Sequence, residues 1–127
     1  MSDFNSLSAT TYISFATFRK SGAMVATPIW CAPHNGHLYL FSARTAGKIK
    51  RLRNSPRAQV AMCDFKGNVQ SAWTDATAHL LNDPAEIGAA LAALRKKYGW
   101  QMHLADLGAK LTGRFARRVY VRVDIGG

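Results

Sequence analysis

The residues best suited to chemistry form a basic run between two strand-like segments, 37–42 and 57–63. Its predicted short helix carries four cations, Lys48, Lys50, Arg51 and Arg53. Thr45 is predicted to cap a short helix here, because its hydroxyl can accept hydrogen bonds from the free amides of the first turn. Free amides and cations at a helix start favour an anion, most often a phosphate. The alternative, a solvated basic helix, stays open because surface lysines are common.

The other candidate motifs in the chain do not match the sequence signatures of known sites. Gly47-Lys48 does not complete a phosphate loop, since Ser42 stands at the first glycine position and Ile49 at the Ser/Thr position. No third ligand at metal spacing accompanies the histidines, and no Gly-x-Ser-x-Gly elbow is present. Cys31 and Cys63 lie in apolar runs, where buried, inert thiols are usual. We therefore assign no catalytic residue and no metal site from these motifs.

Length and charge limit the classes of function. A chain of 127 residues is expected to form a single domain, residues 1–127. Its net charge of +10 suits anionic cofactors, acidic substrates or nucleic acid. Nucleic acid is the less favoured partner, because the C-terminal cations are not interleaved with aromatic residues. No run approaches the ~20 apolar residues of a membrane span, so we expect a soluble, cytoplasmic protein without a membrane partner.

The elements that must position the basic run are mostly strands. Alternating and β-branched patterns predict strands over 12–18, 24–32, 37–42, 57–63, 70–81 and 119–125. Pro28 cannot donate to a ladder, so an edge or a bulge is expected at this point of its strand. Asp83 and Pro84 are predicted to start a helix that runs to Tyr98, and a second helical piece should cover 100–113. The predicted fold is mainly β (α+β), with about six antiparallel strands in a closed or half-closed barrel and one packed helix.

The order of these motifs resembles a known family. The resemblance rests on these segments: 12–22, 25–30, Leu38 to Ser42, Gly47 to Arg57 and, beyond them, 60–64, 73–81 and 94–99. Together they resemble the pyridoxamine 5′-phosphate oxidase-like split-barrel flavoproteins. Within that superfamily the chain is most similar to the branch of probable coenzyme F420-dependent oxidoreductases.

The resemblance implies a split-barrel homodimer with two cofactor sites at the subunit interface. It implies that Thr27, Pro28, Ile29 and Trp30 lie along the ring system of FMN or coenzyme F420, largely through their backbone. Ser42 and Lys48 would approach the phosphate, and Lys50, Arg51 and Arg53 would extend the basic surface. The implied reaction is hydride transfer from the reduced cofactor to an unknown small planar or unsaturated substrate. Such a reaction needs little acid–base chemistry from the protein.

One departure from the family pattern concerns the helix start. The pyridoxamine phosphate oxidases carry an Arg-Lys pair after a Ser, whereas the aligned positions here read Ala46-Gly47-Lys48. The loss of the arginine favours coenzyme F420 over FMN. Two further hypotheses stay open: a non-catalytic flavin- or haem-binding module of the same fold, and a nucleic-acid binder.

Overall fold

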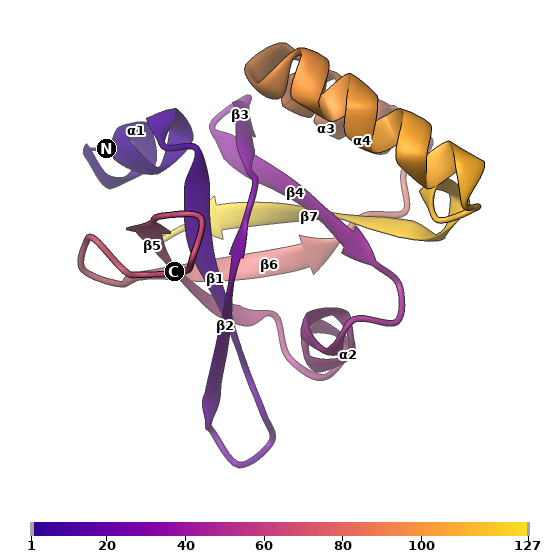
Figure 1. Ribbon diagram of the computed structural model, residues 1–127. Coiled ribbons are helices and arrows are strands. Elements are labelled where there is room, and N and C mark those ends of the chain that lie inside the picture. The colour runs from indigo at the N-terminus through magenta and orange to yellow at the C-terminus, as the bar shows by residue number, and fades with distance from the viewer. Residues whose placement is uncertain (1, 127) are drawn as a thin grey trace.

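The computed structural model describes residues 2–126, with side chains from residue 4 onward (Figure 1). Seven strands form the framework of the fold, and four α-helices, which together contain nearly as many residues as the strands, accompany them in this part of the chain. The elements in chain order are α1 Ser2–Ala9, β1 Tyr12–Phe18, β2 Met24–Ile29, β3 Ala32–His34, β4 His37–Ala43, α2 Gly47–Asn54, β5 Arg57–Cys63, β6 Thr74–Leu80, α3 Pro84–Tyr98, α4 Trp100–Leu111, the 3₁₀ turn η1 Phe115–Arg117 and β7 Arg118–Ile125.

The strands form one antiparallel seven-stranded sheet in the order β2-β1-β5-β6-β7-β4-β3. Its two edge strands, β2 and β3, are consecutive in the chain and are separated only by Trp30 and Cys31. A flat sheet could not place its two ends one short link apart, so the sheet must curl until its edges approach. This is the predicted split barrel, with seven strands rather than about six.

The extra strand arises because segment 24–32 is divided. The backbone of Cys31 is bound by α3 instead of by a strand: its N–H donates to the Tyr98 hydroxyl at 3.0 Å, and its carbonyl accepts from Lys97 Nζ at 2.6 Å. The predicted strand 70–81 is also too long, since β6 begins at Thr74. Ahead of it, the Ser71 hydroxyl accepts the Met62 amide at 2.9 Å and replaces a ladder bond.

Two apolar cores stabilise the sheet. The barrel interior holds Phe15, Leu40 and Val121, and α2 closes it with Ile49 and Leu52, as their three-residue spacing predicts. The outer core lies between the sheet and helices α3 and α4, which run together along one side (Figure 1). It is formed by Ala32, Tyr39, Ala90, Leu94, Tyr98, Met102 and Tyr120.

The helix boundaries test two predicted caps. Asp83 caps α3 as expected, accepting the Ala85 amide at 3.3 Å, and Pro84 occupies the first helical position. The predicted Thr45 cap is wrong: α2 starts one residue later, with Ala46 at the cap in extended conformation and no side-chain hydrogen bond. None of the described helices is long and apolar enough to cross a membrane.

Candidate functional site

The start of α2 carries a guanidinium group above its first turn. Arg51 reaches back along the helix, and its Nε donates to the Thr17 hydroxyl of β1 at 2.7 Å. Gly47 leaves the necessary room, since a Cβ on this residue would lie 2.9 Å from Arg51 Nη1. With no side chain capping the helix at Ala46, a positive group therefore lies where the first-turn amides are also free.

Lys48 lies beside Arg51 and is half-buried. Burial lowers the pKa of Lys48 below its usual value, and the nearby positive charge of Arg51 lowers it further. Among residues 4–126 no carboxylate lies within ion-pairing distance of either side chain. Two neighbouring cations that are partly desolvated and lack a counter-ion form a favourable place for an anion.

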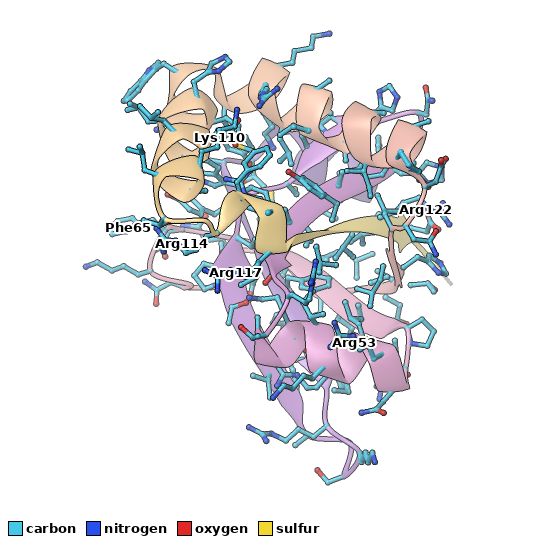
Figure 2. The ribbon with its side chains drawn as sticks, turned by 90° about the vertical axis from the view of Figure 1, so that its right-hand side faces the viewer. Arg53, Phe65, Lys110, Arg114, Arg117 and Arg122 are labelled. Atoms are coloured by element: carbon cyan, nitrogen blue, oxygen red, sulfur yellow. The ribbon has the colours of Figure 1, made fainter. Side chains whose placement is uncertain are left out.

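The other two cations of the basic run lie elsewhere on α2. At 3.6 residues per turn, Lys48 and Arg51 share one flank of the helix, and Lys50 and Arg53 share the opposite flank. Lys50 and Arg53 are exposed. Figure 2 shows Arg53 on the same side of the molecule as Arg114 and Arg117. The structure therefore brings together two of the four predicted cations and separates the other two from them.

Three of the predicted site residues face the barrel interior. Ser42 is buried at the end of β4, on the same strand face as Leu40. Ile29 packs against the inner core. Thr27 lies on β2 opposite Phe15, and its Oγ1 is buried with no hydrogen-bond partner, the only such side-chain atom in the described part of the chain. A buried hydroxyl without a partner costs about 1–3 kcal/mol, so Thr27 has capacity for a ligand atom.

Pro28 and Trp30 face outward. Pro28 is exposed on β2, which is an edge strand as the sequence predicts, and a turn approaches its ring at Gly67. Trp30 stacks on Tyr98, with ring centroids 4.4 Å apart and planes inclined by 12°. One face of the indole is therefore covered by Tyr98. The unpaired backbone edge of β2 runs beside the indole.

The sequence analysis did not identify Thr17 as a site residue. Thr17 is fully buried and lies on the same face of the β1–β2 pair as Thr27, one diagonal step away, at about 7–8 Å in such ladders. The available signal was a hydroxyl at an inward-facing position near the end of an apolar strand. Such a group needs a partner, and here Arg51 provides it.

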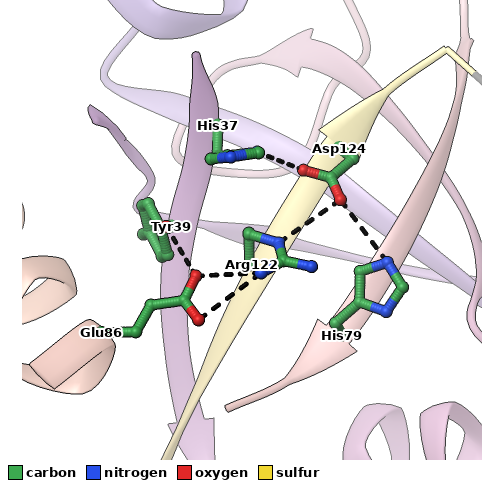
Figure 3. Close-up of polar contacts among 6 residues, drawn as sticks. All are labelled: His37, Tyr39, His79, Glu86, Arg122 and Asp124. Carbon is green, nitrogen blue, oxygen red and sulfur yellow. Dashed lines mark hydrogen bonds and ion pairs between the residues drawn. The ribbon is translucent and has the colours of Figure 1, made fainter. Parts of the chain in front are cut away.

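A second polar cluster lies on the outer sheet face beside α3 (Figure 3). Asp124 contacts His37, His79 and Arg122, and Arg122 reaches Glu86 at 3.1 Å. The Tyr39 hydroxyl donates to Glu86 at 2.8 Å. That bond, together with Arg122, lowers the pKa of Glu86, while burial and Glu86 raise the pKa of Tyr39 to about 12. These charges satisfy one another. No group in the described chain has the ligands for a metal ion.

Two pockets in the described part of the chain are not lined by Lys48 or Arg51. A pocket of about 550 Å³ lies between α3 and the β3–β4 hairpin, lined by residues such as Pro33, His34 and Ala93. Another, of about 380 Å³, lies where the β1–β2 turn meets the end of α2, beside Arg19 and Arg57. Neither pocket is lined by Thr27, Lys48 or Arg51.

A family model for pyridoxamine 5′-phosphate oxidase matches residues 5–125. The chain belongs to this family. A search of curated proteins finds no match. The resemblance described above implies an Arg-Lys pair at the start of this helix, and of that pair only Lys48 stands at its aligned position. However, the Arg51 guanidinium occupies the space that a side chain at position 47 would enter. The helix start thus has both an arginine and a lysine, although the arginine comes from one turn later.

Solved structures share the fold at low identity. A FAD-binding protein from Mesorhizobium loti is 22% identical with a TM-score of 0.63, over 95% of this chain and 83% of that one. The heme storage protein HutZ from Vibrio cholerae is 11% identical with a TM-score of 0.71, over 99% and 87%. A protein described as F420 reductase is 16% identical with a TM-score of 0.61, over 97% and 93%. The same split barrel thus occurs in proteins named for binding or using different cofactors.

Proposed function

We propose that the protein is an oxidoreductase that transfers a hydride from reduced coenzyme F420 or FMN to a small planar or unsaturated substrate. The observation that carries this proposal is the pair Lys48 and Arg51, half-buried at a helix start and without a carboxylate partner in the described part of the chain. The family match supports a flavin-type cofactor. Both cofactors carry a phosphate that this pair would neutralise.

Each predicted site residue then has a definite task. Lys48, Arg51 and the free amides of α2 would hold the phosphate, and Ser42 at the end of β4 would approach it. Thr27 would offer its unpartnered hydroxyl, and the open edge of β2 at Pro28 would run along the ring system, beside Ile29 and Trp30. The cofactor, when bound, supplies the hydride chemistry. Lys50 and Arg53 would contribute only to the field that attracts an anion.

The choice between the two cofactors is more even than the sequence alone indicates. The absence of an arginine at position 47 favoured coenzyme F420. Because Arg51 fills that space and is fixed by Thr17 at 2.7 Å, the helix start retains the charge that an FMN phosphate needs. We therefore retain both cofactors in the proposal.

We further propose a homodimer in which a second copy covers the cofactor site. In the isolated chain, Pro28 and Gly47 at the start of α2 are exposed to solvent, and the pockets beside α3 and at the β1–β2 turn lie elsewhere. Hydride chemistry benefits from a site that excludes water. Sedimentation equilibrium with and without cofactor tests this point: a dimer is expected, and a monomer under both conditions contradicts it.

The cofactor proposal is tested by titrating the purified protein with coenzyme F420 and with FMN while following cofactor fluorescence. Saturable binding of at least one, at micromolar concentration, is expected. No saturation with either contradicts the proposal. Turnover is then tested by presenting the reduced cofactor with quinones and enones and following its reoxidation.

The second candidate function is a non-catalytic carrier. The similarity to a heme storage protein shows that this fold also serves storage. No acid–base pair adjoins the α2 cluster in the described chain, which suits a binding protein as well as a hydride-transfer enzyme. Cofactor binding without multiple turnover of any substrate in the panel would favour the carrier, and multiple turnover would exclude it.

A further inference from the structure

Helix α4 exposes an apolar stripe that neither the fold nor the cofactor site uses. Four large side chains on it are more than half exposed: Trp100 at 70%, Leu104 at 58%, Leu107 at 55% and Leu111 at 80%. Their spacing of four, three and four residues places them within roughly 60° of arc on one helix face. Scattered exposed leucines are ordinary, but a contiguous stripe of this kind marks an interaction surface.

The rest of α4 shows that the stripe does not result from loose packing. The opposite face, with Met102, Asp106 and Ala109, is buried against α3 and the sheet. Asp106 is fixed there by Arg95 at 2.9 Å and by Arg118 at 2.7 Å. The helix is therefore held in one orientation, and that orientation points the stripe to solvent.

Positive charge adjoins the stripe at its C-terminal end. Lys110, Arg114 and Arg117 are all exposed, and Figure 2 shows them on one side of the molecule. The only acidic residue between Trp100 and Arg117 is Asp106, which is buried and already paired with two arginines. The exposed charges of this segment are therefore all positive.

We propose that α4 and the segment after it dock on an anionic lipid surface. An amphipathic helix with Trp and Leu on one face and Lys and Arg beside it binds in the plane of such a surface, through apolar burial and attraction to anionic headgroups. A second copy fits the stripe less well, because it would bring the same three exposed cations, Lys110, Arg114 and Arg117, against those of this segment. Our expectation of no membrane partner rested on the lack of a spanning segment, and peripheral docking needs none.

The test is sedimentation of the full chain with vesicles of phosphatidylcholine alone and of phosphatidylcholine mixed with phosphatidylglycerol. Binding is expected only to the anionic vesicles and should weaken with added salt. The double variant Leu104→Ser/Leu107→Ser should lose about tenfold or more of its partitioning, because apolar area drives insertion. The matched control is Phe65→Ser, since Phe65 is 66% exposed but lies on the β5–β6 turn, and it should bind like wild type.

A charge variant keeps the test decisive if the leucine changes alter folding. Lys110→Gln/Arg114→Gln should also weaken binding to anionic vesicles, while thermal unfolding stays unchanged. No vesicle binding, or equal binding by both double variants and wild type, overturns the proposal. It is likewise overturned if the leucine variant changes only the oligomeric state in sedimentation velocity, which would make the stripe a contact between copies.

Discussion

Two pairs of cationic side chains in this molecule, Arg95 with Arg118 and Arg51 with Lys48, have opposite relations to their surroundings. Around Asp106, Arg95 and Arg118 meet a buried carboxylate and both its oxygens are bound. At the start of α2, Arg51 and Lys48 meet only a hydroxyl and each other's charge. The first pair is complete within the chain, whereas the second has no carboxylate partner among residues 4–126. Charges paired within the chain stabilise the fold, and charges without a counter-ion are where we expect a ligand to bind.

The largest effect expected from this comparison is on stability at Asp106. Asp106→Asn leaves two arginines without their carboxylate, and Arg118 is only 6% exposed. Breaking such a buried pair typically costs about 3–5 kcal/mol in the free energy of unfolding. Urea denaturation measures the loss. The control Asp75→Asn changes an exposed carboxylate and should cost far less. Equal losses of unfolding free energy in the two variants would mean that the ion pairs of Asp106 do not stabilise the fold.

The same carboxylate should make stability depend on pH. Burial alone would raise the pKa of Asp106, but the hydrogen bonds from Arg118 and Arg95 outweigh it and leave the pKa below its usual 3.8. The contribution of Asp106 is therefore fully present above pH 3.8 and is lost as pH falls through the lowered pKa. The difference in unfolding free energy between wild type and Asp106→Asn should shrink between pH 4 and pH 2, as a series of urea denaturations would show. A difference that stays constant over this range contradicts the assignment.

At α2 we expect the opposite of the Asp106 result: a substitution should weaken cofactor binding and leave the free energy of unfolding unreduced. Lys48→Met removes a partly desolvated cation, so the free protein should be at least as stable as wild type. Cofactor binding should weaken by about 1.5–3 kcal/mol, because a charge-assisted bond is lost. Fluorescence titration measures the affinity. The matched control is Lys50→Met on the opposite flank, for which we expect little change in affinity. A variant that loses stability but keeps its affinity would make Lys48 structural.

The smallest effect is expected at Gly47. Gly47→Ala places a Cβ 2.9 Å from Arg51 Nη1, so the guanidinium must shift from the position in which it binds Thr17. Cofactor affinity should fall by about 1 kcal/mol, while unfolding free energy stays equal or rises because Ala favours the helix. Gly88→Ala on α3, where a Cβ meets nothing within 4 Å, is the matched control and should leave affinity unchanged. Unchanged cofactor affinity in both variants would mean that Arg51 does not contribute to the cofactor site.

Local patterns were sufficient to predict most of the fold. The strands 12–18 and 57–63 and the helix that Asp83 starts lie where periodicity and capping place them. Segment 24–32 misled the prediction because its division depends on Tyr98, 67 residues from Cys31 along the chain. No pattern within the segment shows that α3 binds its backbone.

The site was less predictable for a similar reason. The basic run was visible in the sequence, but only the helix geometry separates Lys48 and Arg51 from Lys50 and Arg53. The bond between Arg51 and Thr17 joins residues 34 positions apart, so neither neighbour identifies the other in the sequence. The resemblance suggested a missing arginine at position 47, and only the structure shows another arginine in that space.

The central claim is that the start of α2 binds the phosphate of a flavin-type cofactor. It is tested most directly by comparing the affinity of the wild-type protein for FMN and for riboflavin, and for coenzyme F420 and its phosphate-free deazaflavin fragment. These pairs share a ring system and differ in the phosphate and, for coenzyme F420, in the tail attached to that phosphate. We predict that at least one phosphorylated form binds about tenfold or more tightly than its counterpart, as a charge-assisted contact requires. Equal affinities within both pairs would contradict the claim.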